Sequence, residues 1–194
     1  MSHPAIGRGF SEDERPRVAA LYWAAFGTKL RAAFPDQERG LAVIAASLRP
    51  DNLLIARTDS GVVGVCGFHA GGAGAIDLSW SRLRTHLGIP AAVRAAVCLA
   101  LLDSGTRPET LVLDGICVDD RARGQGIGTL LLAAADDLGR STGARAVQLS
   151  VIETNPGARR LYERVGFRPV STGRLGLLSA VYGFDRFTVM RKDL

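Results

Sequence analysis

The sequence has 194 residues, of which 47% are hydrophobic and 22% are charged, and its formal net charge is +5. These proportions are typical of a globular protein and exclude a disordered or fibrous chain. The length suits one sizeable core, so we expect a single domain over residues 1–194. The longest apolar run, residues 95–102, is far shorter than the roughly 20 residues of a transmembrane helix, which excludes such a span.

Four further features limit the partners and the location. The three cysteines are too few and odd in number for a disulfide scaffold, so reduced thiols are expected. Residues 1–10 lack the apolar segment of a signal peptide, which predicts a cytoplasmic protein with no membrane partner. The basic residues are almost all arginine and are scattered, which disfavours nucleic acid as a partner. The three histidines lack metal-ligand spacing, so no metal is expected.

The first part of the chain is predicted to contain a strand, two helices and a β-hairpin. A strand is expected near residues 5–10, and Ser11 with the acids that follow it is typical of a helix start. Apolar residues at helical spacing continue to Gly27, which is expected to end that helix. The next elements are a helix over residues 36–48 and a hairpin of strands 53–57 and 62–68.

The second part of the chain alternates strands and helices. Residues 69–109 have the least regular pattern, a glycine-rich loop followed by helical stretches at residues 79–87 and 91–102. The elements predicted after them are strand 111–118, a helix from Gly126 or Ile127 with Leu130, Leu131, Ala134 and Leu138 on one face, strand 146–151, helix 156–164, and strands 167–170 and 184–191. This alternation predicts a mixed α/β sheet.

The most informative segment is a glycine-rich turn between strand 111–118 and the helix after it. It reads Val118-Asp119-Asp120-Arg121-Ala122-Arg123-Gly124-Gln125-Gly126-Ile127-Gly128-Thr129. Alternating glycines let backbone N–H groups face outward, and at a helix N-terminus such groups favour an anion such as a pyrophosphate. The G-x-G-x-G spacing fits neither a dinucleotide fingerprint nor a P-loop. Taken alone, the segment is also compatible with a plain strand–helix turn.

A second segment begins 27 residues after Gly128 and reads Asn155-Pro156-Gly157-Ala158-Arg159-Arg160-Leu161-Tyr162-Glu163-Arg164-Val165-Gly166-Phe167. Asn155 followed by proline marks a helix start, and Gly166 is typical of a helix end. Asn155 and Tyr162 lie about two turns apart, roughly 10 Å along one face. Taken alone, Asn155 is equally well explained as a cap and Tyr162 as a core aromatic.

Together the two segments resemble the GNAT superfamily of acetyl-CoA-dependent N-acetyltransferases. The family signature R/Q-x-x-G-x-G/A is matched by residues 123–128, and the pattern N…A…LYE-x-x-GF by residues 155–167. The resemblance covers residues 111–170. It implies an α/β fold of the GNAT type, a mixed and mostly antiparallel central sheet flanked by helices, with splayed strands around the coenzyme A (CoA) site. Family members often form dimers, which makes a homodimer one candidate state.

The resemblance also implies roles for individual residues. Ile116, Cys117 and Val118 would line the pantetheine arm of acetyl-CoA. The pyrophosphate would be bound at Arg123, Gly124, Gln125, Gly126, Ile127, Gly128 and Thr129, chiefly by backbone N–H groups from Gln125 onward. Asn155 would contact the cofactor near the pantetheine, and Tyr162 would point at the thioester sulfur and give a proton to the leaving thiolate.

The reaction needs a base as well as an acid. An alkyl amine has a pKa of about 10.4 and is mostly protonated at neutral pH, so a proton must be removed before it attacks the thioester. Asp114 is the first candidate base, because strand alternation is expected to place it on the face of Ile116 and Val118. The oxyanion formed by attack would be stabilised by a strand N–H such as that of Val118. Some family members carry a glutamate where this sequence has Ser150, which cannot act as that base.

The expected function is transfer of an acetyl group from acetyl-CoA to a primary amine of a small molecule or peptide, by direct attack in a ternary complex. Three alternatives stay open: a catalytically silent acyl-CoA-binding or sensor domain, an acyltransferase that uses another acyl-CoA, and a nucleic-acid-binding module. The cysteines are interpreted as small buried apolar residues rather than nucleophiles. No motif identifies the acceptor, and a place for His69 beside it is a hypothesis only.

Overall fold

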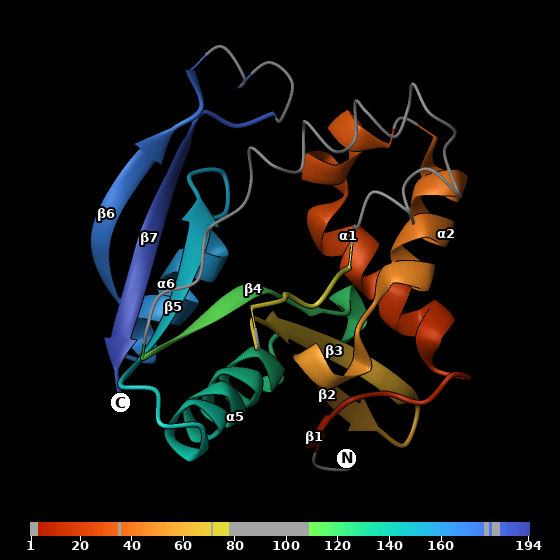
Figure 1. The fold of residues 1–194 in the computed structure, drawn as a ribbon, viewed down its shortest axis with the longest axis horizontal. Helices are drawn as coiled ribbons and strands as arrows, with labels where there is room; N and C mark the ends of the chain where they lie inside the picture. Colours follow the sequence, from red (N-terminus) through yellow and green to blue (C-terminus); the bar gives the residue numbers. More distant parts are fainter. Residues whose placement is uncertain (1–3, 35, 71, 78–108, 177–178, 180–182) are drawn as a thin grey trace.

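A seven-stranded mixed sheet forms the centre of the molecule, with helices on both of its faces (Figure 1). The computed structural model describes residues 4–34, 36–70, 72–77, 109–176, 179 and 183–194, and for residues 26–33 it describes the backbone alone. The helices predicted at residues 79–87 and 91–102 lie outside the described residues. The strands are β1 (Ala5–Arg8), β2 (Leu53–Thr58), β3 (Gly61–Phe68), β4 (Thr110–Val118), β5 (Ala146–Ile152), β6 (Arg168–Arg174) and β7 (Arg186–Asp193).

The strand order is β1-β2-β3-β4-β5-β7-β6, and every neighbouring pair is antiparallel except β4 with β5, which is parallel. This arrangement confirms the predicted fold class, a mixed and mostly antiparallel sheet flanked by helices. The predicted hairpin of residues 53–57 and 62–68 is also confirmed, since β2 pairs with β3 from Leu53 opposite Gly67 to Thr58 opposite Gly61.

The two central strands separate after only three paired residues. β4 pairs with β5 from Thr110 opposite Ala146 to Val112 opposite Gln148. Beyond this point β4 continues along β3 as far as Val118, whereas β5 continues along β7 as far as Ile152. The β4–β5 gap, as we call this opening between the second halves of the two strands, confirms the predicted splay.

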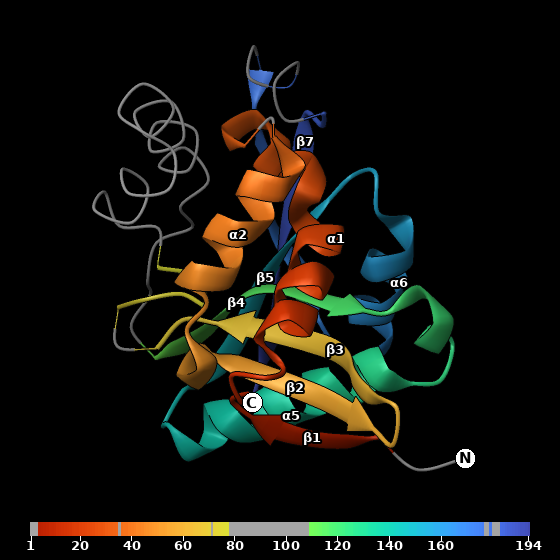
Figure 2. The ribbon, with the colours of Figure 1, turned by 90° about the vertical axis from the view of Figure 1, so that its right-hand side faces the viewer.

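The helices divide between the two faces of the sheet. Helices α1 (Arg15–Ala33) and α2 (Gln37–Ser47) cover one face, and α5 (Ile127–Ser141) covers the other (Figure 2). The α1/α2 cluster consists of Val18, Ala19, Leu21, Tyr22, Trp23, Phe34, Val43, Ile44, Leu48, Leu53, Ile55, Val62, Val65, Ala75 and Cys117. The α5/α6 cluster, which includes α6 (Pro156–Arg164), consists of Leu54, Ala56, Val63, Cys66, Phe68, Leu111, Leu113, Ala122, Ile127, Leu131, Leu132, Ala135, Val147, Leu149, Val151, Tyr162, Phe167 and Met190.

Three local predictions about the helices are wrong. Helix α1 begins at Arg15 rather than after Ser11, because residues 12–14 form a turn in which Glu14 N donates to Ser11 O at 3.0 Å. The same helix runs past Gly27 to Ala33, since one glycine costs a helix only about 1 kcal/mol. On α5 Leu130 is 37% exposed, because the face toward the sheet is made by neighbours such as Ile127 and Leu131.

Candidate active site

The glycine-rich turn leads from the end of β4 through a short helix, η2 (Asp120–Ala122), into α5. Gly124 and Gly126 both have φ of +79°, a backbone conformation that glycine adopts without strain. The first hydrogen bond of α5 runs from Leu130 N to Gly126 O at 3.1 Å. The N–H groups of the residues just before Leu130 therefore lie at the exposed beginning of the helix, which suits a bound anion.

Charged side chains surround this turn in pairs. Arg123 Nη2 lies 2.6 Å from Asp120 Oδ1, and both side chains are largely exposed. Asp119 pairs with Arg17 of α1 and accepts a hydrogen bond from Arg121 N at 2.8 Å. These contacts, led by the one with Arg17, lower the pKa of the Asp119 carboxyl. The acids beside the turn are thus already neutralised by arginines, so they repel an incoming phosphate less than free carboxylates would.

A cavity of about 710 Å³ opens beside the turn. Its walls come from α1, the β2–β3 turn, the end of β4 and the segment that follows β4. Among its lining residues are three that were expected to contact the cofactor, Cys117, Val118 and Gln125. The cavity therefore lies between α1, the β2–β3 hairpin and the start of the glycine-rich turn.

The three β4 residues predicted to line the pantetheine do not share one face. Ile116 and Val118 pack against the α5/α6 cluster, whereas Cys117 belongs to the α1/α2 cluster. Cys117 is buried, and burial raises the pKa of its thiol to about 11. A neutral thiol of this kind fits the interpretation of the cysteines as small apolar residues; Cys66 is also buried and free, and Cys98 lies outside the described residues.

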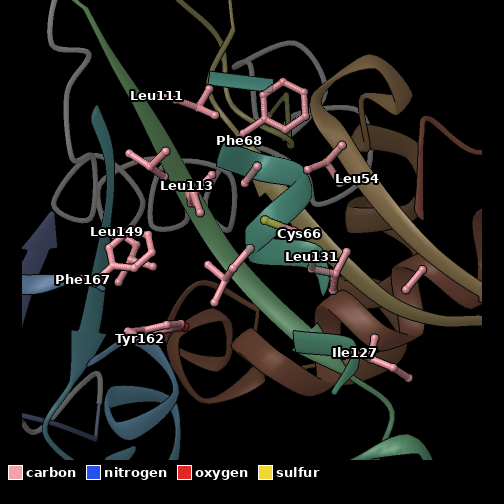
Figure 3. Packing of buried hydrophobic residues seen from close by; sticks show 14 of the residues in the cluster. Leu54, Cys66, Phe68, Leu111, Leu113, Ile127, Leu131, Leu149, Tyr162 and Phe167 are labelled. Carbon is pink, nitrogen blue, oxygen red and sulfur yellow. The ribbon is translucent and has the colours of Figure 1, made fainter. Parts of the chain in front are cut away.

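Tyr162 enters the α5/α6 cluster from α6. Its side chain is 7% exposed, and its ring lies 6.1 Å from that of Phe167. Figure 3 shows Tyr162 close to Phe167 and Leu149 within this cluster. Burial, with a smaller contribution from the Cys66 thiol, raises the pKa of the Tyr162 phenol above its ordinary value. The phenol is therefore protonated at neutral pH and can donate a hydrogen bond.

Asn155 begins α6 as the sequence predicted. Its Oδ1 accepts a hydrogen bond from Ala158 N at 3.0 Å, which is the geometry of a helix cap. The residue as a whole is exposed. A cap function is therefore established, and a contact with a cofactor is compatible with it.

Asp114 lies on the face opposite to the one that strand alternation predicted. Gly67 pairs with Gly115 and Phe68 with Leu113, so Asp114 is an extra residue in a β-bulge. The bulge shifts the alternation, and the carboxylate is turned toward Ala75 of the α1/α2 cluster. Its Oδ2 accepts a hydrogen bond from Ala75 N at 2.7 Å. The prediction that Asp114 shares a face with Ile116 and Val118 is therefore wrong. Its carboxylate is 17% exposed and can be reached from the α1/α2 side of the sheet.

His69 is the partner of Asp114, which the sequence did not reveal. Its Nε2 pairs with Asp114 Oδ1, and its side chain is 18% exposed. His69 follows the last residue of β3, and Asp114 belongs to the neighbouring strand β4. The alternation of side chains along β3 could have predicted that His69 lies on the α1/α2 side of the sheet. Asp114 reaches the same side because of the bulge in β4.

The comparisons with known proteins agree with this geometry. The model of the acetyltransferase (GNAT) family matches residues 15–167. The chain belongs to the GNAT acetyltransferase family. This GNAT chain also resembles solved structures at low sequence identity, and among curated proteins nothing matches it. As a family member it is a transferase of the acetyl-CoA-dependent type.

Three solved structures illustrate the shared GNAT fold. A crystal structure described as an acetyltransferase has a TM-score of 0.62 and 21% identity, covering 97% of this chain and 98% of its own. A GCN5-related N-acetyltransferase from Kribbella flavida has a TM-score of 0.61 and 18% identity over 98% of both chains. The ribosomal-protein-alanine N-acetyltransferase from Brucella melitensis has a TM-score of 0.60 and 19% identity, covering 98% of this chain and 99% of its own.

Two searches of the described part of this GNAT chain gave negative results. Within it, no group of three or more histidine, cysteine, aspartate or glutamate side chains could hold a metal ion. None of the helices described is long and apolar enough to span a membrane.

Proposed function

We propose that this acetyltransferase transfers the acetyl group of acetyl-CoA directly to a primary amine of a small molecule or peptide, within a ternary complex formed by one domain over residues 1–194. The observation that carries this proposal is the β4–β5 gap, which has a proton donor on one face and a carboxylate on the other. Tyr162 belongs to the α5/α6 cluster, and Asp114 lies against Ala75 of the α1/α2 cluster. A thioester in the gap would therefore meet an acid on one side and an incoming amine on the other.

The chain offers a matching group for each part of acetyl-CoA. The N–H groups of Gln125 to Thr129 would bind the pyrophosphate at the start of α5, with the Arg123 guanidinium close by. The pantetheine would run from there along Ile116, Cys117 and Val118, on the edge of β4 that β5 has left. The amide NH₂ of Asn155 would meet the same arm from α6.

The direction of one backbone group supports an oxyanion site. Asp119 N donates to Val63 O on β3 at 2.8 Å. Successive N–H groups of a strand point to opposite edges, so the N–H of Val118 is directed at the gap. There it would stabilise the negative charge that develops on the thioester oxygen as the amine attacks. The C–S bond then breaks, and Tyr162 gives a proton to the leaving thiolate.

The test is an incubation of the protein with acetyl-CoA and a panel of primary amines, with free thiol followed over time. Amine-dependent thiol release with an acetylated product would support the proposal. Calorimetry with CoA that gives binding without turnover on any amine would instead support a silent acyl-CoA-binding or sensor domain. Faster turnover with another acyl-CoA would identify that compound as the preferred donor. DNA binding that weakens steeply as the salt concentration rises would instead support a nucleic-acid-binding module. Light scattering of the same sample would decide between monomer and homodimer.

A further inference from the structure

Gln148 carries a buried oxygen that the fold does not use. Its side chain is 4% exposed, and Oε1 has no hydrogen-bond partner within the part of the chain that the structure describes. Buried acceptors without a donor are unfavourable and rare, which makes this oxygen a candidate contact for a ligand. Gln148 is also the last β5 residue paired with β4, which places it where the two strands part.

Gln148 and His69 lie in one row on the same face of the sheet. His69 N donates to Val112 O at 2.8 Å, and Val112 pairs with Gln148 on its other side. Phe68, Val147 and Leu149 all pack in the α5/α6 cluster, so alternation turns His69 and Gln148 to the opposite face. Two strand spacings separate the backbones of His69 and Gln148, which is about 10 Å. Val112 lies between them and its side chain shares this face, so a small group that both side chains contact would rest on Val112.

The His69–Asp114 pair is held in place by the loop after β3. Asp114 Oδ2 accepts from Ala75 N at 2.7 Å, and a Cβ on Gly74 would come within 2.8 Å of the same oxygen. Asn52, which is buried, fixes this loop from the other side. Its Nδ2 donates to Ala73 O at 2.7 Å and to Gly74 O at 3.0 Å. Such packing and bonding fix the orientation of the carboxylate that His69 contacts.

We propose that Gln148 and His69 hold and deprotonate the acceptor amine at the point where β4 and β5 part. The Gln148 Oε1 accepts one N–H of the amine, and the His69 imidazole takes the proton that the amine nitrogen loses when its new C–N bond forms. The imidazole later releases this proton to solvent. The C–S bond breaks in the same reaction, and Tyr162 protonates the thiolate. Tyr162 then regains a proton from solvent, so for an amine that arrives neutral the net change is one proton moved from amine to thiol.

This inference rests on the proposed acetyl transfer and changes the role of Asp114. Imidazole has an ordinary pKa of about 6.5 and an aspartate carboxyl one of about 3.9, so histidine is the better base near neutral pH. Asp114 then becomes a positioning residue that fixes the imidazole and stabilises its charged form. Among the described residues, the other titratable groups near Asp114 are Tyr22 and Cys66, and their pKa values are raised chiefly by burial and also by that carboxylate. Both stay neutral at the pH of the assay.

The first experiment uses Gln148→Met, with Ser47→Ala as the matched control. Ser47 Oγ is the other buried neutral oxygen without a partner among the described side chains, and it lies on α2. Both variants remove an unsatisfied acceptor, so neither should lower the midpoint of urea unfolding. Gln148→Met alone should raise KM for the amine, by about tenfold, with the Kd of CoA unchanged. An unchanged KM would overturn the role of Gln148, and so would a large loss of stability.

The second experiment uses His69→Gln, whose amide can still donate to Asp114. We expect kcat to fall about 100-fold or more, the acid limb of the pH–rate profile to disappear, and CoA affinity to be retained. An active wild type with an equally active His69→Gln variant and an unchanged profile would overturn this inference but leave the proposed function intact. A wild type that binds CoA and acetylates no amine would overturn both. An unchanged profile with a reduced kcat would also contradict a base at His69.

Discussion

Gly128 on α5 lies directly against Leu161 on α6: a Cβ on Gly128 would come within 2.9 Å of Leu161 Cδ2. This contact joins the helix that begins at the glycine-rich turn to the helix that carries Tyr162. Gly124 and Gly126 have open space around them and a left-handed backbone instead. The three glycines therefore serve two purposes, close helix packing in one case and backbone conformation in the other two.

Replacing Gly126 by alanine, with Gly143→Ala as the control, distinguishes the stability lost through an unfavourable backbone conformation from a loss of CoA binding. Gly126 and Gly143 have φ of +79° and +78°, and a Cβ on either would meet nothing within 4 Å. Both alanine variants should lose about 1 kcal/mol of unfolding free energy in urea. Only Gly126→Ala should weaken CoA binding in calorimetry, by about tenfold, because Gly143 lies beyond the other end of α5.

Gly126→Glu is a stronger test of pyrophosphate binding at the same position. A carboxylate at the start of α5 would repel the pyrophosphate, so CoA binding should be lost while the fold persists. Parental affinity for CoA in this variant would rule out a pyrophosphate at the glycine-rich turn.

Tyr162→Phe should slow acetyl transfer without affecting cofactor binding. The ring stays in its place beside Phe167, and only the hydroxyl that would protonate the thiolate is removed. We expect kcat to fall at least tenfold and the Kd of CoA to change less than twofold. Single-turnover release of free thiol measures the step directly, and a variant as fast as the parent would show that another group is the acid.

Direct transfer predicts that Cys117 takes no part in the chemistry. Burial raises the pKa of its thiol to about 11, so the reactive thiolate is scarce near neutral pH. Cys117→Ala should therefore retain kcat within a few-fold and lose on the order of 1 kcal/mol of stability through the smaller side chain. Mass spectrometry of the parent after acetyl-CoA without amine should find no acetylated cysteine, and a stable acetyl adduct at Cys117 would contradict the ternary complex.

The fold and the local structure of the glycine-rich turn could be predicted from the sequence because both depend on local signals. Gly126 sits at a helix start that needs a left-handed backbone, and Asn155 caps the next helix through Ala158 N. Each signal lies within a few residues of the structure it specifies. The hairpin of β2 and β3 was equally visible, since strand alternation and its turn at Gly61 are local features.

The surroundings of Asp114 could not be predicted because they depend on pairing between strands. The bulge that places Asp114 beside His69 arises where β4 runs along β3, and Gly115 is the sequence signal that could have indicated it, because a glycine inside a strand is typical of a bulge. Simple alternation therefore assigned Asp114 to the wrong face. The unused oxygen of Gln148 has meaning only once its burial and its place at the end of the β4–β5 pairing are known.

The Glu14–Arg57 pair should make stability depend on pH in the acid range. Arg57 binds Glu14 through two hydrogen bonds, Nε to Oε1 at 2.7 Å and Nη2 to Oε2 at 2.8 Å. This contact, assisted by Ser11, lowers the pKa of the Glu14 carboxyl to about 2. A depressed carboxyl pKa contributes stability that is complete above the unfolded value of 4.5 and is lost as the pH falls toward 2.

Glu14→Gln tests this contribution against an exposed control. The free energy of unfolding of Glu14→Gln should lie about 1–2 kcal/mol below that of the parent at pH 7, after allowance for solvent screening. The difference should shrink between pH 4.5 and 2, because the parent then loses its charged carboxylate. Glu12 makes a similar double contact with Arg15 but is 78% exposed, so Glu12→Gln should change stability far less. A Glu14→Gln difference that stays constant down to pH 2 would assign the effect to packing rather than to the charge pair.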